Sequence, residues 1–246
     1  MDSFGETRAR LKILRETGNL NDIIFEQKNI ESKWGEVGGI SYGLLYRDLL
    51  AALTTDKIIK SNSRVLDLSQ DFVQTALAHA DSFDLETEWF LLMYLRYPTR
   101  EIELSNDEII ERNSRVELWL HLLRRLEKEK DPEFDPNDLP TLNVTPPDGS
   151  NGIAGMSPES IQDPELRENY KKAIRANSVK TEYFSNQVRL RQNESSIIDN
   201  GIKYISLMYS QNPFNSTELR SLLEKYDISK ALRNRIIERT DELIKK

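Results

Sequence analysis

The residues best suited to chemistry in this chain begin at a serine between glycines. Residues 39–43 read Gly-Ile-Ser-Tyr-Gly, the G-x-S-x-G pattern that surrounds the nucleophilic serine of many hydrolases. Such a nucleophile sits on a strained turn after a buried strand, but the polar residues 29–38 contain no run of Val and Ile. We therefore expect Ser41 to be the N-cap of a helix beginning near Tyr42. Serine hydrolysis is the alternative.

Acid and base partners for a serine nucleophile follow later in the chain, in the usual order of acid and then histidine. The candidates are Asp67, Asp71, Asp81, Asp84 and His121. His79 and His121 are the only histidines, and we expect both at the edge of a helical core. An acidic pair such as Glu86 and Glu88 in a helical cleft is a second way to build an enzyme.

Metal and nucleotide chemistry have few candidate residues. Glu117 and His121 share a predicted helix face, but the chain has neither H-E-x-x-H nor the paired E-x-x-H motifs of di-iron bundles. The absence of cysteine excludes thiolate zinc sites and disulfides. No Lys-Ser/Thr follows the glycines of residues 35–39, so no phosphate loop is formed there. We expect no metal and no other cofactor.

An acidic run places oxygen ligands at alternate positions, as a calcium loop does. It consists of Asp131, Glu133, Asp135 and Asn137. Counted from Asp131, an EF-hand needs glycine at 136 and a carboxylate at 142, where the chain has Pro136 and Leu142. The run is therefore predicted to be a solvated acidic segment, with weak calcium binding as the alternative.

Basic residues concentrate near the C-terminus, interleaved with Tyr170, Tyr183 and Phe184. The first group is Lys171, Lys172, Arg175, Lys180, Arg189 and Arg191, and the second is Arg233, Arg235, Arg239, Lys245 and Lys246. Such charges could bind the phosphates of a nucleic acid, although no recognition-helix motif accompanies them. We favour docking of the acidic segment onto this basic face.

Prolines and charge divide the 246-residue chain into three parts. Seven of the nine prolines lie between Pro132 and Pro164, which disfavours helix there. Residues 1–130 form a helical N-terminal part with a net charge of −5. Residues 131–163, the acidic segment, form a linker or strap with no Lys or Arg and seven acidic residues, and residues 164–246 form a basic helical part of net charge +5.

Helical patterns predict the elements that must position these residues. Apolar residues recur at helical spacing in residues 41–53, 69–80 and 85–98, and Ser105 with Glu108 forms a capping box before a long helix. Asp163-Pro164 begins another helix, and further helices are expected at 196–209, 216–226 and 229–244. The predicted fold is all-α, either an irregular helical bundle or a helical-hairpin array, since no segment repeats at a fixed period.

No run of 18 apolar residues is present, so no membrane span is expected. The first 16 residues lack the apolar core and cleavage site of a signal peptide. The cytoplasm is the default location. A chain that begins after a removed leader would look the same, which leaves an exported mature chain open.

The C-terminal half resembles a known group of sequences in three places. These read FDPNDLPTLNVTPPDG, SPESIQDPELRENYKKAI and YISLMYSQNPFNSTELRSLLEKY. Over roughly residues 115–246 the chain resembles a group of uncharacterised bacterial all-helical proteins with no assigned activity. The resemblance implies a helical fold, and because members of the group often carry export leaders it keeps an exported location open.

The sequence thus predicts a non-catalytic, helical protein-interaction or scaffold protein, and we expect its partner to be a protein. Stacked helices offer extended surfaces, and the contrast between acidic and basic parts suits electrostatic docking. Nucleic-acid binding through the basic C-terminal helices is one alternative, and hydrolysis at Ser41 is the other.

Overall fold

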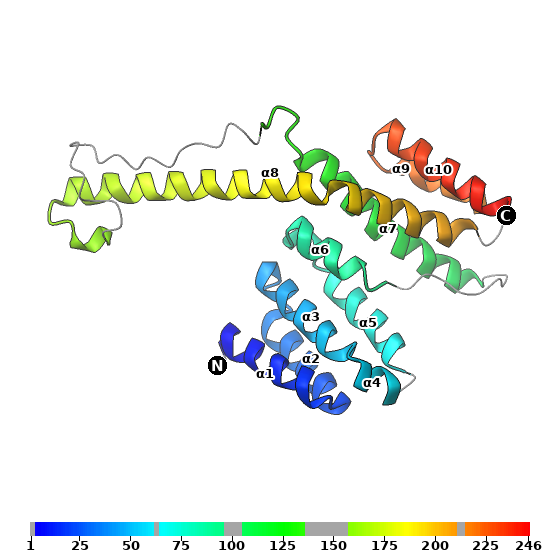
Figure 1. Cartoon of the computed structure of the whole chain (residues 1–246), viewed down its shortest axis with the longest axis horizontal. Helices are drawn as coiled ribbons and strands as arrows, with labels where there is room; N and C mark the ends of the chain where they lie inside the picture. The colour runs from blue at the N-terminus through cyan, green and yellow to red at the C-terminus, as the bar shows by residue number, and fades with distance from the viewer. Residues whose placement is uncertain (1–2, 62–63, 96–104, 136–156, 211–214) are drawn as a thin grey trace. The chain divides into compact units, whose positions relative to one another are not determined.

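The computed structural model describes residues 3–61, 64–95, 105–135, 157–210 and 215–246. These residues form ten α-helices and two short 3-10 helices, with no strand among them (Figure 1). The all-α fold class predicted from the sequence is therefore confirmed.

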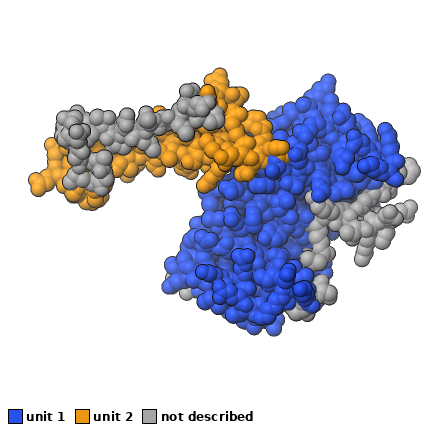
Figure 2. All heavy atoms as spheres, in the orientation of Figure 1, with its two compact units in different colours: residues 1–127, 196–246 blue, residues 128–195 orange. Residues whose placement is uncertain are grey.

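The contacts within the chain define two compact units. Unit 1 consists of Met1–Glu127 and Ser196–Lys246, and unit 2 consists of Lys128–Ser195 (Figure 2). Residues 196–246 thus belong to the same unit as the N-terminal helices. The boundaries at 131 and 164 in the sequence analysis differ from these because they were set by proline and charge content. Part of the acidic segment, residues 136–156, lies outside the described residues.

The first part of unit 1 is a set of short helices around a buried central helix, α3. In chain order these are α1 (Phe4–Thr17), α2 (Leu20–Trp34), α3 (Gly39–Leu53), α4 (Asp56–Ser61), α5 (Val65–Leu77), the 3-10 helix η1 (Ala80–Ser82) and α6 (Leu85–Leu92). Helix α3 packs against α1, α2, α5 and α6. Its predicted apolar residues, Tyr42, Leu45, Tyr46, Leu49, Leu50 and Leu53, are all fully buried.

Local signals set the ends of these helices. Ser3 and Glu6 form a reciprocal capping box at the start of α1. Gly18 ends α1 in the left-handed conformation with φ 66°, where a Cβ would be strained. The side chain of Asn19 then accepts hydrogen bonds from the first turn of α2.

The second part of unit 1 combines α7 (Asn106–Glu129) with the end of α8 and the last two helices, α9 (Asn215–Lys225) and α10 (Lys230–Ile244). The predicted capping box is confirmed, because Glu108 accepts from the backbone of Ser105 at 2.9 Å and its own amide donates to the Ser105 hydroxyl at 3.4 Å. The ring of Trp119 on α7 lies 5.9 Å from that of Tyr204 on α8, and Gly201 allows the two helices to approach closely at Leu123.

A polar network joins α7, α8 and α9 inside this part. Arg112, which is 4% exposed, donates to Glu218 at 2.5 Å, and Asn113 donates to the same carboxylate at 2.9 Å. The hydroxyl of Tyr209 donates to Asn113 at 2.5 Å. Burial raises the pKa of Tyr209 to about 12, so the phenol stays a neutral donor. The network fixes how α9 meets α7.

Unit 2 contains the first two-thirds of α8 and the described ends of the acidic segment. Helix α8 (Pro164–Ser210) is a single helix of 47 residues, whereas the sequence predicted separate helices before and after residue 190. No Pro or Gly lies between residues 165 and 200, so nothing in this stretch breaks the helix. The predicted start is confirmed, since Asp163 accepts hydrogen bonds from the amides of Glu165 at 2.8 Å and Leu166 at 3.1 Å.

Candidate interaction surface

The structure corrects the predicted role of Ser41. Helix α3 begins at Gly39 with Gly38 as its N-cap, which has φ 60° and no capping side chain. Ser41 lies in the first turn and is exposed, and its hydroxyl has no hydrogen-bond partner among the described residues. The second glycine of the motif, Gly43, serves packing: a Cβ there would lie 2.6 Å from Cγ2 of Thr87 on α6. Hydrolysis at Ser41 stays an untested alternative.

The structure brings Asp81 and His121, two of the candidate triad residues, within bonding distance of each other. The group at the centre of this cluster is the buried carboxylate of Glu88. Glu88 on α6 is fully buried, and its two oxygens lie 2.9 Å from Nδ1 of His121 and 2.6 Å from Nη1 of Arg125. Nε2 of His121 lies 2.9 Å from exposed Asp81. The hydrogen bond to Glu88 raises the pKa of His121, although burial opposes the rise. Both ring nitrogens are therefore engaged in holding α6 and η1 to α7.

The other predicted acids lie elsewhere. Asp84 is the N-cap of α6 and accepts from the amide of Thr87 at 2.7 Å. Glu86 and Glu88 are two residues apart on one helix, about 200° around its axis, so they do not face each other. Asp67 and Asp71 are exposed on α5. Glu117 shares α7 with His121, but the carboxylates within bonding distance of that imidazole are Glu88 and Asp81.

A second buried polar cluster was missed by the sequence. The hydroxyls of Tyr42 and Tyr46 on α3 both donate to Oε1 of Glu31 on α2. Burial, and then these hydrogen bonds to a carboxylate, raise the pKa of both tyrosines, which therefore stay neutral donors. The ring of His79, the other histidine, lies 4.9 Å from that of Tyr42 in an edge contact. The sequence did contain a signal for this cluster, because two tyrosines four residues apart on an otherwise apolar helix face need buried hydrogen-bond partners.

The acidic run of residues 131–137 contacts its own chain. Asp131 accepts a hydrogen bond from the hydroxyl of Tyr183, and its backbone amide donates to Gln187 at 3.0 Å. The fourth predicted calcium ligand, Asn137, lies outside the described residues. Within the described ranges, no three metal-ligating side chains converge on one point.

The basic face of α8 is the most exposed part of the described chain that also carries large apolar residues. Between residues 172 and 186, Asn177 and Phe184 are half-buried and every other residue is exposed. We call residues 172–186 the exposed α8 segment. It includes Ile174 at 38%, Val179 at 67% and Tyr183 at 41% exposure. Helix α8 is therefore buried at Tyr170 and at Gln187 and exposed between them.

The cations of this region divide into engaged and unpaired groups. Lys171 forms an ion pair with Glu159 at 3.6 Å, and Arg191 donates to the backbone oxygens of Asp131 and Phe134 at 2.7 and 3.3 Å. The cations with no ion pair or hydrogen bond among the described residues are Lys172, Arg175 and Lys180. The described ends of the acidic segment thus contact α8, and three cations between them have no partner in the part of the chain that the structure describes.

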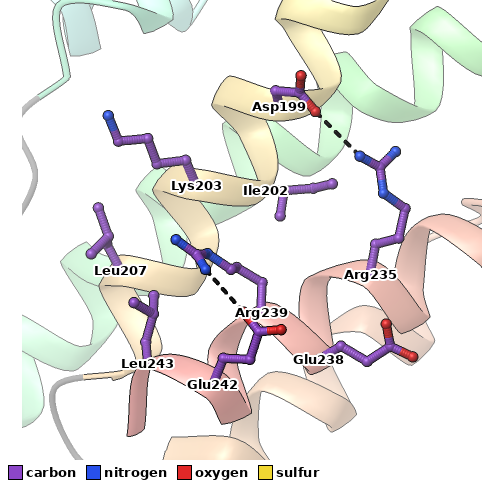
Figure 3. A pocket seen from close by; sticks show the side chains of 9 residues that line it. All are labelled: Asp199, Ile202, Lys203, Leu207, Arg235, Glu238, Arg239, Glu242 and Leu243. Carbon is purple, nitrogen blue, oxygen red and sulfur yellow. Dashed lines mark hydrogen bonds and ion pairs between the residues drawn. The ribbon is translucent and has the colours of Figure 1, made fainter. Parts of the chain in front are cut away.

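Two of the basic residues predicted near the C-terminus, Arg235 and Arg239, line a shallow groove beside α8. This groove, of about 480 Å³, lies between α8 and α10 (Figure 3). Arg235 pairs with Asp199 across it at 3.2 Å, and Arg239 pairs with Glu242 along α10 at 2.9 Å. Positive and negative side chains alternate along its walls, so the groove has no net preference for an anionic ligand.

A second groove, of about 640 Å³, lies between α1 and α3. Arg8 and Asp48 form an ion pair of 2.6 Å across it, and Lys12 and Arg15 extend the basic side. Its apolar lining consists of the half-buried Phe4, buried Leu11 and small alanines. It offers less exposed apolar surface than the exposed α8 segment.

Comparison of the chain with protein families, with curated proteins and with solved structures found no match. Among the helices that the structure describes, none combines the length and the hydropathy needed to cross a bilayer.

Proposed function

We propose that this protein is a non-catalytic interaction protein that binds a protein partner through the exposed α8 segment. One observation carries the proposal. A helix that turns almost its whole circumference to solvent between residues 172 and 186 also presents Ile174, Val179 and Tyr183 there. Three large apolar side chains exposed within residues 174–183 of one helix favour a binding surface.

The polar groups with the strongest claim to chemistry support the same interpretation. Glu88 binds both His121 and Arg125, and Glu31 binds two tyrosines, so these groups hold helices together. Neither of the two grooves described above contains these groups. Within the exposed α8 segment, five side chains have no such role among the described residues and so stay available for a ligand: Lys172, Ile174, Arg175, Val179 and Lys180.

A site-specific photocrosslinker tests the proposal. It replaces Val179 in the full-length chain in its native cells, and Asn21, exposed on α2, serves as the control position. We expect one protein adduct at 179 and none at 21. The partner, identified by mass spectrometry and purified, should bind the wild-type chain and lose affinity for Val179→Ser. Adducts at both positions or at neither would contradict the proposal.

A further inference from the structure

We infer that the partner segment bound by the exposed α8 segment is acidic and carries spaced apolar side chains. The inference rests on the proposed function and specifies its partner. Three observations support it: the contacts that α8 makes with the acidic segment, the unpaired cations, and the position of the exposed apolar residues.

The acidic segment of the same chain shows which chemistry α8 accepts at one end. Asp131 accepts from the hydroxyl of Tyr183, while the ring of Phe134, 8% exposed, packs 5.5 Å from that of Phe184. The guanidinium of Arg191 lies over the same phenylalanine ring at 5.8 Å. A carboxylate and an aromatic anchor three residues apart are thus bound together.

The other end of the acidic segment repeats this combination. Glu159 pairs with Lys171 at 3.6 Å, and Arg167 donates to the backbone oxygen of Ile161 at 2.6 and 2.8 Å. The side chain of Ile161 is buried, with 7% exposure. Here too a carboxylate lies two residues from an apolar anchor. Helix α8 therefore binds acidic chain with apolar side chains at both ends of its open stretch.

The open stretch between these ends has the same character and lacks an occupant among the described residues. Lys172, Arg175 and Lys180 are exposed and form no ion pair with any residue that the structure describes. Viewed down the helix axis, at 100° per residue, the three cations lie within an arc of about 140°. Val179 lies on this arc between Arg175 and Lys172. Val179, the most exposed apolar residue of the segment, therefore lies on the same side of the helix as these cations, which suits an apolar side chain flanked by carboxylates.

Nucleic acid and membrane surfaces fit this arrangement less well. Phosphate backbones bind through many cations, and they provide no partner for Val179 at the centre of the patch. A helix that lies in a membrane interface needs one broad apolar face, whereas Ile174 and Val179 are about 140° apart around the axis. An acidic protein segment with apolar side chains can pair its carboxylates with the cations and pack an apolar side chain against Val179.

The inference is tested with purified full-length chain and a labelled synthetic helix. The probe is a peptide of about 18 residues with leucines at i, i+3 and i+4 spacing and glutamate elsewhere. A second probe has serine in place of leucine, and a 20-nucleotide single strand and phosphatidylserine vesicles test the other surfaces. Binding is followed by fluorescence anisotropy, and for the vesicles by co-sedimentation.

We expect the Glu/Leu peptide to bind best, and its affinity to fall about tenfold in K172E/R175E/K180E because three exposed charge pairs are reversed. Val179→Ser should weaken the same probe and leave the Glu/Ser peptide unchanged. The matched control is K12E/R15E/K28E, which reverses the same number of exposed Lys and Arg residues in unit 1. Its affinity should stay within about twofold of wild type. Circular dichroism verifies that each variant is folded.

Equal binding of the Glu/Ser and Glu/Leu peptides would overturn the inference, because charge alone would then explain the attraction. Tighter binding of the oligonucleotide or the vesicles would overturn it in favour of phosphate. A partner that crosslinks at residue 179 yet binds K172E/R175E/K180E normally would refute the acidic partner and leave the proposed function standing. No crosslink at 179 together with normal peptide binding would refute the function alone.

Discussion

Glu88 shows how a single residue can hold two helices together. A carboxylate with no solvent exposure is costly to bury unless cations face it. Arg125 is charged at every accessible pH, whereas His121 is charged only below its pKa, which the hydrogen bond to Glu88 raises above the usual value. The attachment of α6 to α7 should therefore depend on pH.

The sign of this dependence follows from the raised pKa of His121. A raised folded-state pKa adds stability that is fully present below the unfolded value of about 6.5 and is lost as pH rises through the folded pKa. Asp81 acts in the same direction as Glu88, and Arg125 opposes them. We expect Glu88→Gln to lower the free energy of unfolding by about 2 kcal/mol near pH 6, and less above pH 8.

Denaturant titration across pH checks this prediction, together with NMR titration of the His121 ring. His79→Gln provides the control, because it leaves His121 as the single histidine and makes the signal unambiguous. A difference between wild type and Glu88→Gln that stays constant from pH 6 to pH 9 would contradict the role given to His121.

Gly43 makes a second prediction at the residue scale. A Cβ at this position would lie 2.6 Å from Thr87 and 3.2 Å from the ring of Phe83, and both neighbours are buried. Gly43→Ala should therefore cost about 1–3 kcal/mol of unfolding free energy through overpacking between α3 and α6. Gly5→Ala is the matched control: the nearest atom to its Cβ is 4.0 Å away, so it should be neutral or stabilising by up to about 1 kcal/mol. If Gly43→Ala and Gly5→Ala changed the thermal stability equally, helix propensity and not packing would determine the effect at Gly43.

At the scale of the element, helix caps and apolar periodicity explain what the sequence could predict. The residues of α3 and α7 that recur at helical spacing are buried as expected, and Ser105, Asp163 and Ser229 cap the helices that follow them. Helices α1 and α2 were not predicted; α1 gave a weak periodic signal because it buries only Thr7 and Leu11. The capping box formed by Ser3 and Glu6 was the sequence signal that could have predicted the start of α1.

The candidate surface was only partly predictable for a related reason. The sequence placed cations and aromatic residues along α8, and the structure shows which of them the acidic segment engages. Periodicity shows which side of a helix is apolar, but it does not show whether another element covers that side. The exposure of Ile174 and Val179 depends on tertiary packing, so no local pattern could predict it.

The start of α8 makes a prediction at the same scale. Asp163 accepts from two amides in the first turn, at 2.8 and 3.1 Å. Asp163→Ala should destabilise this turn by about 1 kcal/mol, whereas Asp163→Asn keeps an accepting oxygen and should cost less than half of that. Hydrogen exchange at the amides of Glu165 and Leu166 measures the effect. Equal protection in the two variants would show that the cap does not determine where the helix begins.

At the scale of the whole molecule, the division into two units predicts where a perturbation stops. Phe134 is nearly buried within unit 2, where its ring meets Phe184 at 5.5 Å and Tyr183 at 6.4 Å. Phe134→Ser removes this contact and should lower the free energy needed to open this part of unit 2 by about 2–3 kcal/mol. The amide of Asp131, which donates to Gln187 at 3.0 Å, should then exchange at least about tenfold faster with solvent.

Exchange in unit 1 should stay unchanged, because its core amides in α3 and α7 are protected by contacts within that unit. Ile174→Ser serves as the control: this side chain is exposed on the same helix, so its removal should change exchange in neither unit. Faster exchange throughout α3 in Phe134→Ser would show that the two units unfold as one. Confinement to residues 128–195 would instead mean that the chain around Phe134 can detach from α8 while unit 1 stays folded. Binding of a partner to the exposed α8 segment then need not disturb unit 1.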